Sequence, residues 1–247
     1  MFSDTLVFSV LVCMIPLLSV FAVMLILVKE FKALWGILSI FLGFAAVIPI
    51  TAAQLAIESH GLIITSTLAG VFLKNLLICG LIEESIKMAL MFILPSKKIA
   101  LSGFFACALT AGLSLGCFET LAYLVIAGSS LELRMLTAVI IHTCCAGLSG
   151  LFVYSVKTGS PRPLSLILAI VLHGLYNYFA GFKSGSFFFW FSSCFMRSFS
   201  SAMRMMGLRG ETISLSLTSF TSYATVPYSI PLAVSTTTLS PILGSSS

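Results

Sequence analysis

The chain has 247 residues, of which 59% are hydrophobic and 9% are charged, and its formal net charge is +5. Soluble domains carry about 25% charged residues, so this composition excludes a soluble protein and indicates a helical protein that crosses a membrane several times. The Lys and Arg residues stand singly or in pairs between apolar segments, which argues against a nucleic-acid-binding face and makes them indicators of topology.

Apolar segments recur along the chain with the length that a membrane span requires, about 20 residues. Six segments meet this length, and a seventh, Ser186 to Met196, is too short to cross by itself. We therefore predict an all-α fold, a polytopic transmembrane helical bundle of about six to seven membrane segments. The six spans are residues 5–28, 33–53, 73–94, 99–127, 133–156 and 163–182.

The first apolar segment follows Asp4 without any basic residue and is longer than the core of a signal peptide, so we expect it to remain as a helix. Residues 1–60 then hold two N-terminal transmembrane helices, and residues 61–185 form a core of four helices. A short hydrophobic and basic segment follows at 186–210. Residues 211–247 are rich in Ser and Thr, which predicts a disordered tail. The seven cysteines include no CxxC pair and are expected to be core residues.

The apolar stretch from residue 61 to 94 is too long for one span. We place a break at Lys74-Asn75, which makes residues 61–72 an interfacial or re-entrant piece. Basic residues are most frequent in alternate loops, and this asymmetry predicts a cell-membrane protein with its N-terminus outside and Lys97 and Lys98 in the cytoplasm. Lys74 is expected to reach the outer interface. Glu58, His60 and Glu132 are expected to be solvated loop residues.

The third predicted span contains three charged residues, Glu83, Glu84 and Lys87. A charge at the bilayer centre costs about 2.5–3.5 kcal/mol on insertion scales, so such residues usually face a bundle interior and serve a function there. On a helix, Lys87 is spaced to pair with either carboxylate. The second carboxylate then needs hydrogen bonds, a proton or a metal. The simpler alternative is a buried salt bridge that only fixes helix packing.

Four consecutive spans carry polar residues at one predicted depth. Counted from the outer end of each span, Glu84, Glu119, His142 and His173 all lie about nine to eleven residues in. Asn177 lies one turn beyond His173 on the same helix face. Each residue alone is compatible with a role in packing, but their coincidence favours a functional site.

Two kinds of hydrolytic chemistry fit this set. A carboxylate among apolar helices can take a proton from water and deliver it to a leaving amine, while an imidazole donates to the oxyanion. Alternatively, His142, His173 and Glu119 could bind a zinc ion that activates the water. The metal-free glutamate mechanism is slightly preferred, because only Asn177 is spaced as a second ligand on the helix of either His. The same residue types also fit a proton-coupled transporter or channel, which would space them along the membrane normal.

Four motifs follow one another on successive predicted spans. They are Glu83-Glu84-Ser-Ile-Lys87, the Gly-rich run from Gly112 to Glu119, Arg134 followed by His142, and His173-Gly-Leu-Tyr-Asn177. In this order they resemble the PrsW family of intramembrane proteases, a distant relative of the CAAX-protease and bacteriocin-processing group. The first is similar to the EExxK motif of that family, and the second to its Gly-rich helix that ends in Glu. The resemblance covers roughly residues 75–182.

This resemblance implies an intramembrane endopeptidase that hydrolyses membrane-anchored proteins, for example an anti-sigma factor in regulated proteolysis. The implied partners are such a substrate and the lipid bilayer, without nucleic acid. The chain departs from the family in Thr120, where many members have Asn, and in its Ser/Thr-rich tail. A degenerate homologue that binds a membrane partner without cutting it is therefore an alternative. The implied roles are an acid/base pair, Glu83 and Glu84, completed by Glu119, His142 and His173, with Lys87 and Asn177 supporting.

Overall fold

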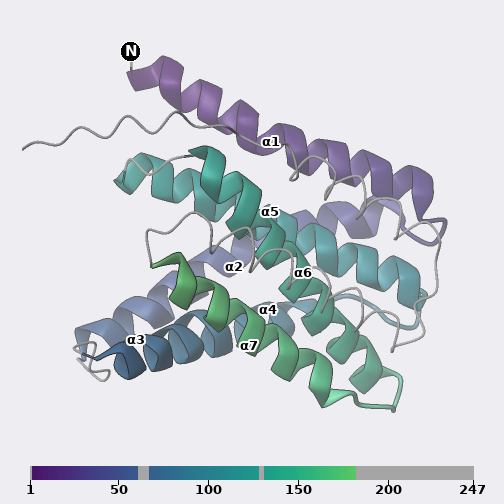
Figure 1. Ribbon diagram of the computed structural model, residues 1–247. Coiled ribbons are helices and arrows are strands. Elements are labelled where there is room, and N and C mark those ends of the chain that lie inside the picture. The colour runs from purple at the N-terminus through teal and green to yellow at the C-terminus, as the bar shows by residue number, and fades with distance from the viewer. Residues whose placement is uncertain (1, 61–66, 128–130, 182–247) are drawn as a thin grey trace, which may run out of the picture. The chain divides into compact units, whose positions relative to one another are not determined.

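The computed structural model describes residues 2–60, 67–127 and 131–181, and every regular element among them is a helix (Figure 1). The all-helical prediction is therefore confirmed for these residues. They belong to one compact unit, residues 1–209, and a second unit, residues 210–247, lies outside the described ranges. The elements are α1 (Phe2–Leu27), α2 (Ala33–Ser59), α3 (Leu68–Lys74), the π-helix η1 (Asn75–Ile82), α4 (Glu83–Met91), α5 (Leu101–Ala127), α6 (Leu131–Lys157) and α7 (Pro163–Ala180).

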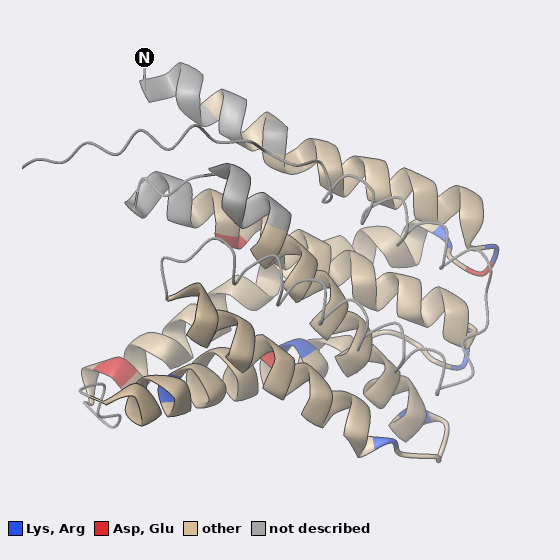
Figure 2. Ribbon diagram, viewed as in Figure 1, with Lys and Arg blue, Asp and Glu red and all other residues tan. Residues whose placement is uncertain are grey.

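Four of the described helices are long and apolar enough to cross a membrane: α2, α5, α6 and α7. In α1 a shorter apolar stretch runs from Cys13 to Leu27. Charged residues are few, and Figure 2 shows most of them near helix ends. The chain is thus a helical membrane protein, whereas the number of six to seven segments stays a prediction. The predicted seventh segment, 186–196, and the Ser/Thr-rich tail lie outside the described residues.

The third predicted span is continuous with the segment before it, so the predicted break at Lys74-Asn75 is wrong. Thr67 caps the N-terminus of α3 by accepting a hydrogen bond from the Gly70 amide at 3.0 Å. Elements of 7, 8 and 9 residues then follow one another without a loop to Met91. The chain changes from α-helix to π-helix at Asn75, whose Nδ2 donates to the Val71 carbonyl across this junction. π-Helices are rare in proteins, and those that occur are frequently found at functional sites.

Glu58 and Lys74 form an ion pair of 2.7 Å that joins the end of α2 to the end of α3. The sequence analysis placed Glu58 in a loop and left Lys74 free to reach the interface. The loop assignment of Glu58 is wrong, because α2 continues to Ser59 and brings the carboxylate beside the ammonium, while the reach of Lys74 to the interface stays a prediction. Both side chains remain substantially exposed, so the pair contributes about 1 kcal/mol or less.

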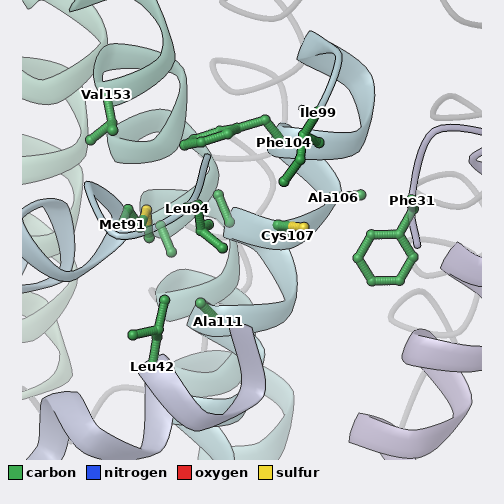
Figure 3. Close-up of a cluster of buried hydrophobic side chains, with 12 residues drawn as sticks. Phe31, Leu42, Met91, Leu94, Ile99, Phe104, Ala106, Cys107, Ala111 and Val153 are labelled. Carbon is green, nitrogen blue, oxygen red and sulfur yellow. The ribbon is translucent and has the colours of Figure 1, made fainter. Parts of the chain in front are cut away.

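Helix α5 is the centre of the packing. It contacts α6, α2 and α1, and most of its span is buried. Around its first half lies an apolar cluster with residues from α2, α4, α6 and the loops (Figure 3). Lys157, at the end of α6, donates to the Phe92 and Leu94 carbonyls just beyond α4. The cluster includes Phe31, Leu42, Met91, Leu94, Ile99, Phe104, Cys107, Ala111 and Val153.

Glycines allow two helix pairs that carry the polar residues to approach closely. A Cβ on Gly116 of α5 would lie 2.9 Å from Val139 Cα and 3.3 Å from His142 Cβ on α6. A Cβ on Gly174 of α7 would lie 2.8 Å from Leu76 Cα on η1. Both contacts need a residue without a side chain, as in other close-packed membrane helices. They set the spacing of α5 from α6 and of η1 from α7.

Candidate active site

The structure brings the predicted polar residues of four helices together. The rings of His142 and His173 lie 4.8 Å apart between centroids, in an edge-to-face arrangement. Glu83 and Glu84 approach these rings from α4, and Glu119 approaches from α5. Four of these five side chains are buried, whereas that of Glu119 is 26% exposed.

The carboxylate of Glu84 is fully buried and has a hydrogen bond on each oxygen. Its Oε1 atom accepts from Lys87 Nζ at 2.5 Å and from His173 Nδ1 at 2.8 Å. Its Oε2 atom accepts from the Ser149 hydroxyl of α6 at 2.8 Å. Three donors from three helices therefore hold Glu84 in place. Both oxygens of Glu84 are therefore engaged, unlike those of a carboxylate that is free to accept a proton.

Glu83 has a different environment, although it is the next residue in the chain. Its Oε1 atom accepts a hydrogen bond of 2.9 Å from Gln54 Nε2 on α2. Its Oε2 atom faces both imidazoles, at 3.7 Å from His173 Nε2 and 3.9 Å from His142 Nδ1. These two distances are too long for direct hydrogen bonds. The carboxylate thus points one oxygen into a space that it shares with both rings.

The two histidines each present one nitrogen to a carboxylate and the other toward this space. Because a carboxylate only accepts, His173 Nδ1 carries the hydrogen that Glu84 binds, and Nε2 holds a free electron pair. His142 Nε2 contacts Glu119 Oε2 in the same way. The Nδ1 atom of His142 then carries the lone pair of that ring, and at 3.4 Å it accepts a hydrogen bond from Lys87 Nζ.

Asn177 and Thr120 do not join the hydrogen bonds described above. Asn177 Nδ2 donates to the backbone carbonyl of His173, one turn earlier in α7, and so stabilises that turn. Thr120 is fully buried, and its hydroxyl has no hydrogen-bond partner. Arg134, which the motif pattern included, is in α6, but its side chain lies outside the described part of the structure.

The chain matches a known protein family. Residues 25–202 match the family described as PrsW family intramembrane metalloprotease, which is well over half of the chain. The chain belongs to the PrsW family. No curated protein and no solved structure matches it. All the residues that carry the EExxK, Glu, His and HxxxN motifs fall within the matched PrsW region.

The donor atoms of this PrsW protein fit a divalent metal. Glu83, His142 and His173 offer one ligand atom each, and these atoms lie within 4.8 Å of one another. His173 Nε2 is one of only two buried side-chain polar atoms in the described residues that have no hydrogen-bond partner. Two His and one Glu are the ligands of many zinc hydrolases, and a carboxylate on the far nitrogen of a metal-binding His is the usual support. The sequence analysis offered Glu119 as the third ligand, whereas the group that lies within 4.8 Å in the structure contains Glu83.

Two members of the PrsW site were missed by the sequence analysis, Gln54 and Ser149. Gln54 is the only glutamine in the chain, and it interrupts an otherwise apolar and small-residue helix. Ser149 lies two turns after His142, a spacing that places both residues on one face of α6. These were the available signals, but Ser is common in membrane helices and does not by itself mark a site.

Proposed function

We propose that this protein is an intramembrane endopeptidase that hydrolyses peptide bonds of membrane-anchored proteins. The observation that carries the proposal is the convergence of Glu83, His142 and His173 on one buried space between apolar helices. Family membership supports the same reaction class. A zinc ion held by these three residues would act as a Lewis acid toward the attacking water and the peptide carbonyl.

The neighbouring residues prepare the three ligands for this role. Glu84 holds His173 in the tautomer that leaves Nε2 available, and Lys87 and Ser149 hold Glu84. Glu119 fixes His142 from the opposite side. Each contact restricts the rotation of a ligand side chain in advance, so less side-chain entropy is lost when the ligands bind a metal. The site is therefore organised before the substrate arrives.

Proton transfer falls to Glu119 in this proposal. It is the only carboxylate of the cluster with substantial exposure, at 26%, so water and substrate can reach it. It can take a proton from the attacking water and return it to the leaving amine, as a general base and then a general acid. Glu119 is also engaged, by His142 Nε2, but Glu84 is less suited to this role because it is fully buried and three donors hold both of its oxygens. The metal-free mechanism of the sequence analysis would instead use Glu83 as the base.

The rival functions fit the geometry less well. A proton relay needs titratable groups in series across the membrane, whereas Glu83, His142 and His173 surround one point. A homologue that only binds a partner would not need this convergence of donor groups. We further propose that the substrate is a single-span membrane protein, such as an anti-sigma factor, and that the enzyme lies in the cell membrane with its N-terminus outside.

A reconstituted cleavage assay tests this proposal. Purified protein in proteoliposomes is incubated with a set of single-span substrates, and the products are analysed by mass spectrometry. Wild type should cut at least one substrate near the membrane, and Glu83→Gln should lower the rate by a factor on the order of 10² or more. Glu58→Gln is the matched control, because Glu58 lies outside the site and pairs only at the surface. Equal cleavage by wild type and Glu83→Gln would refute the assignment.

A further inference from the structure

Helix α2 brings a polar side chain to the site. Gln54 donates its Nε2 hydrogen to Glu83 Oε1 at 2.9 Å, across a separation of 29 residues in sequence. Ala46 and Ile50 precede it on the same face of α2 and are buried against Leu115 of α5 and the side chains of Ile86 and Leu90. Gln54 thus continues the buried face of α2 into the polar site.

The contact selects which oxygen of Glu83 is available. Gln54 occupies Oε1, and Oε2 is left facing His173 Nε2 and His142 Nδ1 at 3.7 and 3.9 Å. Without the amide, the carboxylate could rotate about its terminal torsion, which is broad and roughly two-fold, and either oxygen could turn toward the rings. A ligand that is free in this way loses more entropy when it binds a metal.

Packing alone does not explain why α2 has Gln at this position. The last fully buried residue of α2 is Ile50, and no residue from Thr51 to Ser59 is buried. An amide at a half-buried membrane position is costly unless it is hydrogen-bonded, and the hydrogen bond of Gln54 is made to the site rather than to backbone. The Lys74–Glu58 pair lies one turn further along the same face and joins the same part of α2 to α3.

We propose that Gln54 is a positioning residue that orients Glu83 as a single-oxygen metal ligand. The inference rests on the proposed metal site. It assigns to α2, which carries none of the family motifs, a direct part in forming that site. Gln54 touches neither the proposed metal nor the reacting atoms; it acts through Glu83.

Metal affinity measures this role without reference to catalysis. Full-length wild type, Gln54→Ala and Gln54→Met are purified in detergent, stripped of metal and titrated with Zn²⁺ against a chromophoric chelator. Met has nearly the shape of Gln but no amide, so it separates the lost hydrogen bond from a lost volume. Both variants should bind Zn²⁺ about 10- to 100-fold more weakly than wild type.

A second measurement distinguishes the positioning of Glu83 by Gln54 from a general effect of α2 packing against the bundle. Co²⁺-loaded wild type and Gln54→Met should differ in their visible absorption bands, because the bands respond to the ligand geometry of the metal. Ser114→Ala is the matched control: it removes another hydrogen bond to α2, the 2.9 Å contact from the Ser114 hydroxyl to the Ile40 carbonyl, which does not involve Glu83 or either histidine. This control should bind Zn²⁺ and Co²⁺ as wild type does.

The outcomes separate the two proposals. If wild type binds no Zn²⁺ in a one-to-one ratio, the metal site itself is wrong. If wild type binds Zn²⁺ and Gln54→Met binds it within about twofold of wild type with the same Co²⁺ spectrum, the positioning role of Gln54 is overturned while the metal site stands. A loss in Ser114→Ala equal to that in Gln54→Met would also overturn it, because any weakened α2 contact would then have the same effect.

Discussion

The Nδ1 atom of His173 lies 2.8 Å from Oε1 of Glu84. Both side chains are fully or almost fully buried, and His173 comes from α7, one of the described helices that are apolar enough to cross a membrane. The hydrogen bond decides the tautomer of the imidazole and so decides that the opposite nitrogen can bind a metal. Glu84 therefore influences the proposed metal site indirectly, by fixing the tautomer of His173.

Removing the charge of Glu84 should destabilise the protein. Glu84→Gln leaves the Lys87 ammonium buried without its carboxylate, which we expect to cost about 3–5 kcal/mol. The double variant Glu84→Gln with Lys87→Met removes both charges and should recover much of this loss. Unfolding in mixed micelles of increasing denaturing detergent gives the free energies. A double variant as unstable as the sum of the single variants would contradict the pairing.

Metal removal should stop proteolysis and metal addition should restore it. Active protein should contain about one zinc per chain, and His173→Ala should lose both the metal and the activity, since Nε2 of this residue is a proposed ligand. Elemental analysis alongside the cleavage assay measures this. Full activity in protein with less than a tenth of the stoichiometric metal would favour the glutamate mechanism with Glu83 as the base.

Glu119 and Glu83 should differ in what they contribute. Glu119→Gln keeps the three proposed ligands and removes only a support of His142, so Zn²⁺ affinity should fall about 10- to 100-fold, while the turnover number should fall by a factor on the order of 10² to 10⁴. Glu83→Gln should weaken Zn²⁺ binding more strongly because it changes a ligand. Measuring Zn²⁺ affinity and turnover on both variants assigns the roles. The proposal fails if Glu119→Gln turns over substrate as fast as wild type.

The close contact between η1 and α7 should be sensitive to a single methyl group. A Cβ on Gly80 would lie 2.5 Å from the Ile170 carbonyl oxygen, so Gly80→Ala must push the two helices apart. The distance between His173 and the Glu83-Glu84 pair would increase, and we expect a loss of stability of about 1–3 kcal/mol together with weaker Zn²⁺ binding. Leu81→Ala is the control, because Leu81 is exposed. Equal effects of the two substitutions would remove the contact as the cause.

Topology is testable by accessibility labelling. Single-cysteine variants in a background without native cysteines should be labelled from the cytoplasm at positions 97 and 157 and from outside at position 130, which lies beyond the described residues. Labelling of positions 97 and 130 from the same side would show that the orientation, and the shared depth of the polar residues, were assigned wrongly.

Composition and motif order were sufficient to predict a helical membrane protein of the PrsW family and to select the residues that meet in space. The different environments of Glu83 and Glu84 could not be predicted from the sequence. Glu83 and Glu84 are adjacent, so only the positions of Gln54, Ser149 and His173 around them show which carboxylate is held and which faces the histidines. These contacts span 29 to 89 residues, and no local pattern encodes them. The π-helix was also missed, because its residues have the same apolar composition as an α-helix.

The segment from Leu68 to Met91 also constrains how the protein is made. It carries Glu83, Glu84 and Lys87, and each charge adds about 2.5–3.5 kcal/mol to the cost of entering the lipid alone. The groups that stabilise Glu84 from outside its own helix, Ser149 and His173, are synthesised only later. As a membrane span, this segment would therefore have to wait at the translocon or the interface until α6 and α7 follow. We expect a nascent chain that ends before Ser149 to leave this helix without its stabilising partners in the bilayer.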